Sequence, residues 1–216
     1  MTFASNKTNS KHTKCAKLAT AYIVRIAFMA AMLTAFKFAL SFIPNVEVVT
    51  LMICVYGSAM GLAYALPATL VFCTVEIAIY GVGSWVLLYY VYWTLLATVS
   101  SLLLKGGRTP LAVIIGIVGS LIFGVLSACC DTLFCVANLA PAYLGRYWVA
   151  YYIRGLYFDV VHTISNAVIL AVLYAPLVAV TRRFAPTVCV KARAPKQMRP
   201  YLLTEYVRFV DEIDSK

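Results

Sequence analysis

Charged residues are so sparse along this chain that they divide it into long apolar runs. Residues 48–75, 77–104, 109–130 and 160–181 contain no Asp, Glu, Lys or Arg. A helix needs roughly 20 residues to cross about 30 Å of hydrocarbon, and each run reaches that length. The pattern therefore predicts an all-α, polytopic membrane protein.

Glycine and proline divide the longest runs into separate helices. A single helix over residues 48–80 would be about 50 Å long, so we expect a turn marked by Gly61 and Pro67 and a second break at YGVGSW. This gives a bundle of six transmembrane helices, at residues 19–43, 48–63, 66–81, 84–104, 110–130 and 148–181. The second and third are short for a bilayer, so either neighbouring helices should cover them or they should lie where the membrane is locally thin.

Composition and charge agree with the helical pattern. Hydrophobic residues make up 63% of the chain and charged residues 12%, and the mean hydropathy is +0.88, which a soluble domain does not show. Lys and Arg accumulate on the cytoplasmic side of membrane proteins. The three basic clusters share one side only if the number of spans is even, so both termini are expected in the cytosol. The expected organisation is a basic N-terminal segment (1–18), a six-helix transmembrane substrate-binding domain (19–183) and a cytoplasmic tail (184–216).

Topology also explains the net charge of +10. The basic residues lack the interleaved aromatic side chains of a nucleic-acid platform, so no nucleic-acid partner is expected. Three of the seven cysteines, Cys129, Cys130 and Cys135, cluster at the end of the fifth predicted helix. A disulfide is chemically allowed there, but without C-x-x-C spacing or a His partner we expect no metal and no cofactor.

The last apolar segment carries a polar face. Gly155, Asp159, His162 and Asn166 follow i, i+4, i+7 and i+11 spacing, which places them on one side of a helix. An unpaired carboxylate in a bilayer costs several kcal/mol, so this face should look into the bundle or a wet cavity. Asp159 and His162 are one turn apart and close enough to hydrogen-bond each other. The face can contact a ligand or hold helices together, and we favour ligand contact.

Aromatic and charged residues add further candidates. Trp85, Tyr89 and Trp93 recur at four-residue spacing; Trp85 fits an interfacial aromatic belt, whereas Trp93 lies two turns deeper and favours a wall for a planar ligand. Glu76 falls in the middle of the third span and requires a partner or a proton. Lys37 is expected to extend toward the outer surface.

Two stripes of small residues permit close approach of helices. In the fifth predicted helix the spacing favours packing inside the bundle, whereas in the first helix internal packing and a partner helix remain open. The stripes are Gly116, Ser120 and Gly124, and Ala27, Ala31, Ala35 and Ala39.

The order of these features resembles the substrate-binding S component of energy-coupling factor (ECF) transporters, the vitamin importers of prokaryotes. The resemblance covers residues 17–183. It rests on six helices with cytosolic termini and on three segments: AFMAAMLTA in the first helix, IPNVEVVTL in the first outer loop, and GLYFDVVHTISNAVILAVLYAPL in the last helix.

The resemblance implies a multi-pass protein of the prokaryotic plasma membrane that captures a vitamin-like small molecule from outside. It also implies docking onto a transmembrane T subunit driven by two ABC ATPase subunits. No G-x-x-x-x-G-K-[ST] sequence is present, so ATP hydrolysis is expected in the partners and the chain itself is not expected to be an enzyme. The family's A-x-x-x-A docking motif corresponds to Ala27 and Ala31, or to Ala31 and Ala35.

The same resemblance assigns roles in the binding pocket. Asn45 and Glu47 would form its lid, and the tryptophans and tyrosine of the fourth helix (Trp85, Tyr89 and Trp93) its wall. Asp159, His162 and Asn166 would form its polar floor. On this assignment, Asn166→Ala should weaken ligand binding and leave the stability of the ligand-free protein near wild type.

Two other classes of function remain open. An intramembrane enzyme would use Asp159 and His162 as an acid/base or metal pair, with Glu76 available as a third group. An autonomous secondary transporter would show inverted repeats with broken helices, and the sequence contains no internal repeat. The many aromatic residues favour a planar heterocyclic ligand without naming it.

Overall fold

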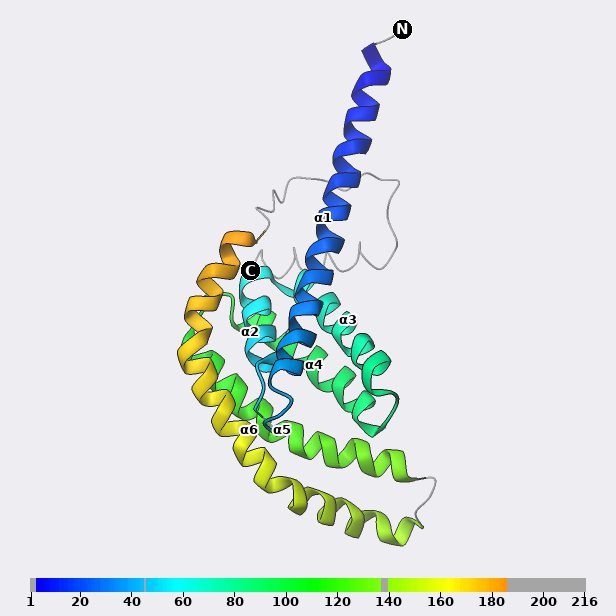
Figure 1. Ribbon diagram of the computed structural model, residues 1–216, viewed down its shortest axis with the longest axis vertical. Helices are drawn as coiled ribbons and strands as arrows, with labels where there is room; N and C mark the ends of the chain where they lie inside the picture. Colours follow the sequence, from blue (N-terminus) through cyan, green and yellow to red (C-terminus); the bar gives the residue numbers. More distant parts are fainter. Residues whose placement is uncertain (1–2, 45, 137–139, 186–216) are drawn as a thin grey trace. The chain divides into compact units, whose positions relative to one another are not determined.

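The computed structural model describes residues 3–44, 46–136 and 140–185, with side chains from Leu18 onward. These residues form six helices and no strand, which confirms the all-α prediction (Figure 1). The helices are α1 (Phe3–Ala39), α2 (Val49–Met60), α3 (Leu62–Tyr80), α4 (Ser84–Leu103), α5 (Thr109–Cys135) and α6 (Pro141–Phe184). All except α2 contain a segment long and apolar enough to cross a membrane. The tail after Ala185 lies outside the described residues.

The short helix α2 is enclosed by its neighbours, as its length requires. It has 12 residues, and ten in succession, from Val49 to Ser58, are buried. Twelve residues span only about 18 Å, too little to cross the hydrocarbon. Gly57 sets the closeness of α2 to α4, because a Cβ atom there would lie 2.8 Å from the backbone nitrogen of Ser101. The expectation that α2 is covered is therefore confirmed.

The turn between α2 and α3 is tighter than predicted. Gly61 alone makes it, with a φ of 76° that favours glycine. Pro67 lies inside α3 instead of marking the turn, so that part of the prediction was wrong. Proline has no N–H to donate to the carbonyl of Ala63, four residues earlier. The hydroxyl of Tyr22 on α1 donates to this carbonyl at 2.7 Å, which satisfies the group that Pro67 leaves without its helical donor.

The α5–α6 hairpin is also longer than predicted. The outer loop expected between residues 130 and 148 is mostly helical, because α5 continues to Cys135 and α6 begins at Pro141, a favourable first helical residue. The three clustered cysteines therefore lie on the last turns of α5, where they are free thiols. Asp131 accepts hydrogen bonds from Ser84 at 2.6 Å and from Tyr147 at 2.5 Å, which fastens this extension to α4 and α6.

The small residues of α1 and α5 face different surroundings. Ala27, Ala31 and Ala35 are exposed, while Ile26 and Leu33 supply part of the inner face of α1. Within the part of the chain that the structure describes, the α1 stripe is therefore not buried against a neighbouring helix. In α5, Gly116, Ser120 and Gly124 are buried against α6, as predicted.

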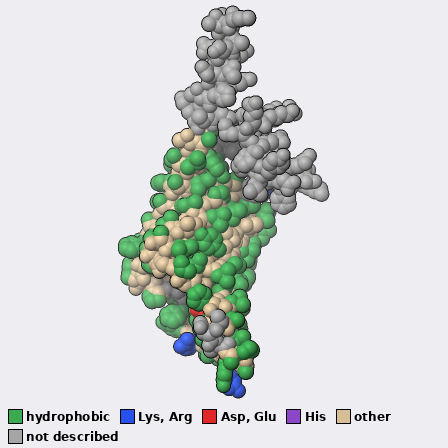
Figure 2. Space-filling view, turned by 90° about the vertical axis from the view of Figure 1, so that its right-hand side faces the viewer, with side chains coloured by type: hydrophobic (Ala, Val, Ile, Leu, Met, Phe, Trp, Pro, Cys, Tyr) green, Lys and Arg blue, Asp and Glu red, His purple; other side chains and the backbone are tan. Residues whose placement is uncertain are grey.

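Apolar side chains cover most of the coloured face in Figure 2, consistent with contact with lipid.

Two of the three basic clusters meet at one end of the bundle. The guanidinium of Arg182, at the end of α6, donates to the backbone carbonyl of Lys105 at 3.1 Å. Lys105 belongs to the loop that joins α4 to α5. Two helices, α5 and α6, separate the two clusters along the chain, so both clusters are expected at the same end of the bundle, as this contact shows. The cytoplasmic location of that end stays a prediction.

Candidate ligand-binding site

A cavity of about 310 Å³ lies where α1 passes into α2. Its walls come from the end of α1, the following loop, and helices α2 to α6. The lining residues are Lys37, Leu40, Ser41, Ile43, Pro44, Val46, Glu47, Val49, Tyr80, Tyr89, Trp93, Phe123 and His162. Its size and its mainly apolar lining with a few polar groups are typical of a small-molecule site.

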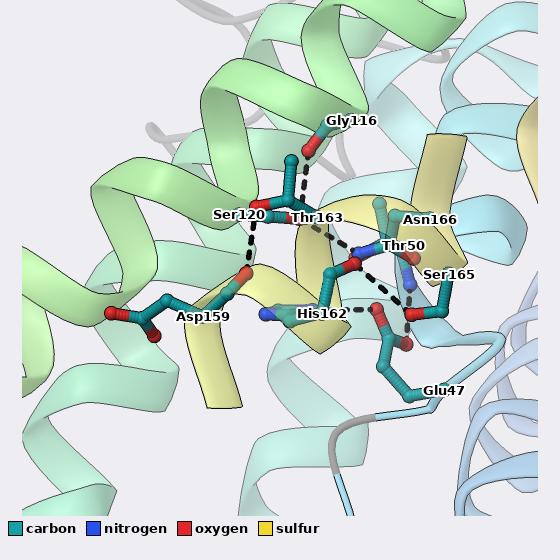
Figure 3. Close-up of polar contacts among 9 residues, drawn as sticks. All are labelled: Glu47, Thr50, Gly116, Ser120, Asp159, His162, Thr163, Ser165 and Asn166. Carbon is teal, nitrogen blue, oxygen red and sulfur yellow. Dashed lines mark hydrogen bonds and ion pairs between the residues drawn. The ribbon is translucent and has the colours of Figure 1, made fainter. Parts of the chain in front are cut away.

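Glu47 joins the loop to two helices. One of its carboxylate oxygens accepts the backbone N–H of Thr50 at 2.8 Å, and the other lies 3.3 Å from Nε2 of His162 (Figure 3). Burial alone would raise the pKa of Glu47, but the contacts with His162 and Thr50 outweigh it and lower the pKa below its usual value. Glu47 is therefore ionised at neutral pH. Since a carboxylate only accepts, the His162 tautomer that bonds it carries the proton on Nε2.

A chain of ring contacts forms one wall of the cavity. The ring of Tyr89 lies edge-on to Trp85 at 5.1 Å and to Trp93 at 5.8 Å between centroids. Phe123 continues the chain, 6.2 Å from Trp93 and 5.2 Å from the His162 ring. Trp93 is only 3% exposed, and its Nε1–H has no acceptor among the described residues. The wall thus offers aromatic surface and one buried donor that lacks a partner.

Lys37 and Glu76 form an ion pair that links α1 to α3 beside this wall. Glu76 is 1% exposed and Lys37 24%. The Lys37 ammonium also lies 4.7 Å from the centroids of the Tyr80 and Tyr89 rings, and 5.9 Å from that of Trp85. The ammonium of Lys37, which was expected to extend toward the outer surface, thus has an acidic partner and three electron-rich rings around it. The partner that Glu76 required is Lys37.

The residues on the polar face of α6 contact different parts of the protein. Asp159, His162 and Asn166 are all buried on one side of the helix, as their spacing predicted. Only His162 lines the cavity. The Asp159 carboxylate lies against Gly124 of α5 and points away from His162 (Figure 3). The pairing expected between Asp159 and His162 is replaced by the contact of His162 with Glu47.

Asn166 is fully buried between three helices and does not line the cavity. Its amide nitrogen donates to the hydroxyl of Ser120 on α5 at 2.9 Å and lies 3.4 Å from the hydroxyl of Thr50 on α2. The Ser120 hydroxyl in turn donates to the carbonyl of Gly116 at 2.8 Å. Asn166 therefore links α2, α5 and α6 and does not line this cavity, and its place in a ligand-contacting floor stays a prediction.

Asn166→Ala is now expected to destabilise the ligand-free protein by about 2 kcal/mol, because it leaves two buried hydroxyls without their shared partner. Affinity for a ligand in the cavity should change less than twofold. Thermal unfolding and calorimetric titration of the detergent-solubilised protein measure the two quantities. Wild-type stability combined with weakened binding would instead support the predicted contact between Asn166 and the ligand.

The remaining predicted site residues divide into three groups. Glu47, Tyr89, Trp93 and His162 line the cavity together. Trp85 contacts Tyr89 but does not line the cavity, and Asn45 lies outside the described residues. Sequence reasoning missed Lys37, Tyr80 and Phe123. The isolated charges of Lys37 and Glu76, which are opposite in sign and both fall within predicted spans, were the available signal for the ion pair.

Comparison of the chain with models of known protein families, with characterised proteins and with solved structures finds no match.

Proposed function

We propose that this protein is the substrate-binding S component of an ECF-type importer in a prokaryotic plasma membrane. It captures a vitamin-like small molecule at one end of the bundle and delivers it through a T subunit powered by two ABC ATPases. The observation that carries the proposal is the cavity of about 310 Å³ beneath the α1–α2 loop, with its aromatic wall and its few polar groups.

The lining favours a flat, neutral or weakly basic ligand. Tyr89, Trp93 and Phe123 offer ring surface, and an aromatic pair adds about 0.5–1.5 kcal/mol beyond burial of its area. The ionised carboxylate of Glu47 accepts hydrogen bonds from ligand N–H or O–H groups, and the indole N–H of Trp93 supplies a donor. The charge of Lys37 is balanced by Glu76, so the described residues that line the cavity include no unpaired Lys or Arg to select an acid.

The exposed alanines of α1 support docking to a partner helix. Ala27, Ala31 and Ala35 are exposed and lie on one side of α1. Small residues at this spacing let two helix backbones approach closely, which is how helices associate where lipid removes the hydrophobic driving force. A T subunit that packs on this surface would complete the transporter.

The test separates ligand capture from docking. Wild-type protein purified without added ligand should retain a small molecule that appears as a mass difference in native mass spectra. Ala31→Trp should keep that molecule yet abolish cellular uptake and co-purification with the T subunit, because the indole separates the helix backbones. Val168→Trp, at a 57% exposed position of α6, is the matched control and should leave uptake intact.

Two results would contradict the proposal. A wild-type protein that carries no small molecule, and is not thermally stabilised by any of a panel of vitamins and nucleobases, would remove the ligand-binding function. Loss of ligand in Ala31→Trp, with uptake falling equally in Val168→Trp, would remove the docking surface.

A further inference from the structure

The last helix is much longer than a membrane crossing requires. α6 has 44 residues, and a helix of that length measures about 66 Å, whereas the hydrocarbon of a bilayer is about 30 Å thick. Its uncharged run, residues 160–181, is long enough to cross by itself. Figure 1 shows that α6 is bent: its yellow first part runs across the lower end of the bundle at a steep angle to α1, and its orange second part turns to follow the direction of α1. If the second part crosses the membrane, the first part lies along the membrane surface.

The two parts of α6 also differ in composition. Residues 141–157 include five tyrosines, one tryptophan, two arginines and no Asp or Glu, whereas residues 160–181 include one tyrosine, no tryptophan and no charged residue. Tyrosine and tryptophan collect where hydrocarbon meets the lipid headgroups, because each ring is apolar and carries one polar group. The guanidinium of arginine is a strong donor to phosphate. The first part therefore has the composition of a helix at the interface, and the second part that of a spanning helix.

The exposed side of the first part carries two stripes of different chemistry. One stripe is apolar and follows i, i+4 and i+7 spacing: Val149, Ile153 and Leu156, which are 48%, 59% and 41% exposed. The other stripe is polar and aromatic, follows i, i+11 and i+14 spacing, and is likewise exposed: Tyr143, Arg154 and Tyr157. At 3.6 residues per turn the two stripes are neighbours on the helix surface. A helix that lies in the plane of the membrane can bury the first stripe in hydrocarbon and keep the second among the headgroups.

Contacts with α5 fix which side of this segment is turned outward. The hydroxyl of Tyr147 donates to Asp131 on α5 at 2.5 Å, and the indole N–H of Trp148 donates to the sulfur of Cys129 at 3.4 Å. Asp131 also accepts from Ser84 at the start of α4, so the segment is fastened to the bundle. Tyr147 and Trp148 lie on the side of the helix opposite the two stripes. The stripes are therefore turned away from α5 and available to a partner.

We propose that residues 141–157 lie flat in the interface of the lipid bilayer, with phospholipid headgroups as their partner. The apolar stripe contacts the upper parts of the acyl chains. Arg154 and the hydroxyl groups of Tyr143 and Tyr157 contact phosphates and water, and the exposed side chain of Arg146 adds a second guanidinium. This surface does not depend on the ligand or on the transport partners proposed above.

Photolabelling of the wild-type protein tests the proposal without any substitution. The full-length protein is reconstituted in phosphatidylcholine vesicles with a trace of phosphatidylcholine that carries a diazirine either in the headgroup or at the end of an acyl chain. Adducts are then mapped by mass spectrometry of peptides. The headgroup probe should mark residues 141–157 more strongly than the chain-end probe, and residues 160–181 should show the reverse ratio. Residues 141–157 without lipid adducts would overturn the proposal, because the segment would then face water or another protein.

Depth along the helix distinguishes a flat segment from a spanning one. Val149→Trp and Leu156→Trp are each placed in a background whose three native tryptophans are phenylalanines, and quenching by brominated lipids gives the depth of each indole. The two depths should be equal in a flat helix, whereas seven residues of a spanning helix separate them by about 10 Å. Ile164→Trp and Val172→Trp are the matched control in the second part and should differ by about 12 Å. A difference near 10 Å between the first two variants would also overturn the proposal.

Discussion

Glu76→Gln is expected to lower the free energy of unfolding by about 3 kcal/mol. Removing one member of a buried ion pair leaves the other charge uncompensated, a loss that measures about 3–5 kcal/mol in other proteins. We expect the lower end of this range because the charge left behind belongs to Lys37, which is 24% exposed to the cavity, whereas Glu76 is 1% exposed. The change should appear as a reduced midpoint in denaturant unfolding of the detergent-solubilised protein.

The double variant Lys37→Met/Glu76→Leu provides the matched control. It removes both charges and fills the space with apolar atoms of similar size, which is often neutral or stabilising for buried pairs. Its stability should therefore return to within about 1 kcal/mol of wild type. If the double variant were as unstable as Glu76→Gln, the ion pair would not be the cause, and the contacts of Lys37 with Tyr80 and Tyr89 would have to account for the loss.

Gly124→Val should also destabilise the protein strongly, by about 3 kcal/mol. A Cβ atom at Gly124 would overlap the carboxylate of Asp159. Overpacking a buried site costs about 1–3 kcal/mol, and displacing a carboxylate from its place between two apolar helices adds to this loss. Thermal unfolding monitored by circular dichroism would show the shift.

Two companion variants identify the cause. Gly124→Val/Asp159→Ala removes the displaced group and should regain most of the stability. Gly116→Ala places its new methyl group against Cδ1 at the flexible end of Leu170, so it should cost only about 1 kcal/mol. If Gly116→Ala proved as harmful as Gly124→Val, general crowding between α5 and α6 would explain both, with no special part for Asp159.

The sequence predicted the helices well, but it predicted poorly which side chains contact one another across helices. The length of each apolar run and the glycines and prolines between runs reveal each helix. Spacing of i, i+4 and i+7 reveals which residues share a helix face, and it predicted that Asp159, His162 and Asn166 are buried together. Spacing does not reveal which neighbour stands opposite each position. His162 meets a loop and Asn166 meets two other helices, although only one turn separates them.

The ion pair illustrates the same limit. Lys37 and Glu76 are 39 residues apart and belong to different helices, so no local pattern relates them. Pro67 shows that a proline is not a reliable sign of a helix end. It can lie inside a helix where another helix supplies a hydrogen-bond donor, here the hydroxyl of Tyr22, for the carbonyl that the proline leaves free.

The contact between Glu47 and His162 has a consequence for biogenesis. The two residues are separated by 115 positions, so the loop that covers the cavity has no partner on α6 until nearly the whole membrane domain has been synthesised. At about 5–20 residues per second, the ribosome needs roughly 6–23 s to cover that distance. During this interval Glu47 lacks its contact with His162, although helices α1 to α5 are already leaving the ribosome. The cavity is thus among the last features to be completed, and the binding function that we propose for it would arise only when the final helix enters the membrane.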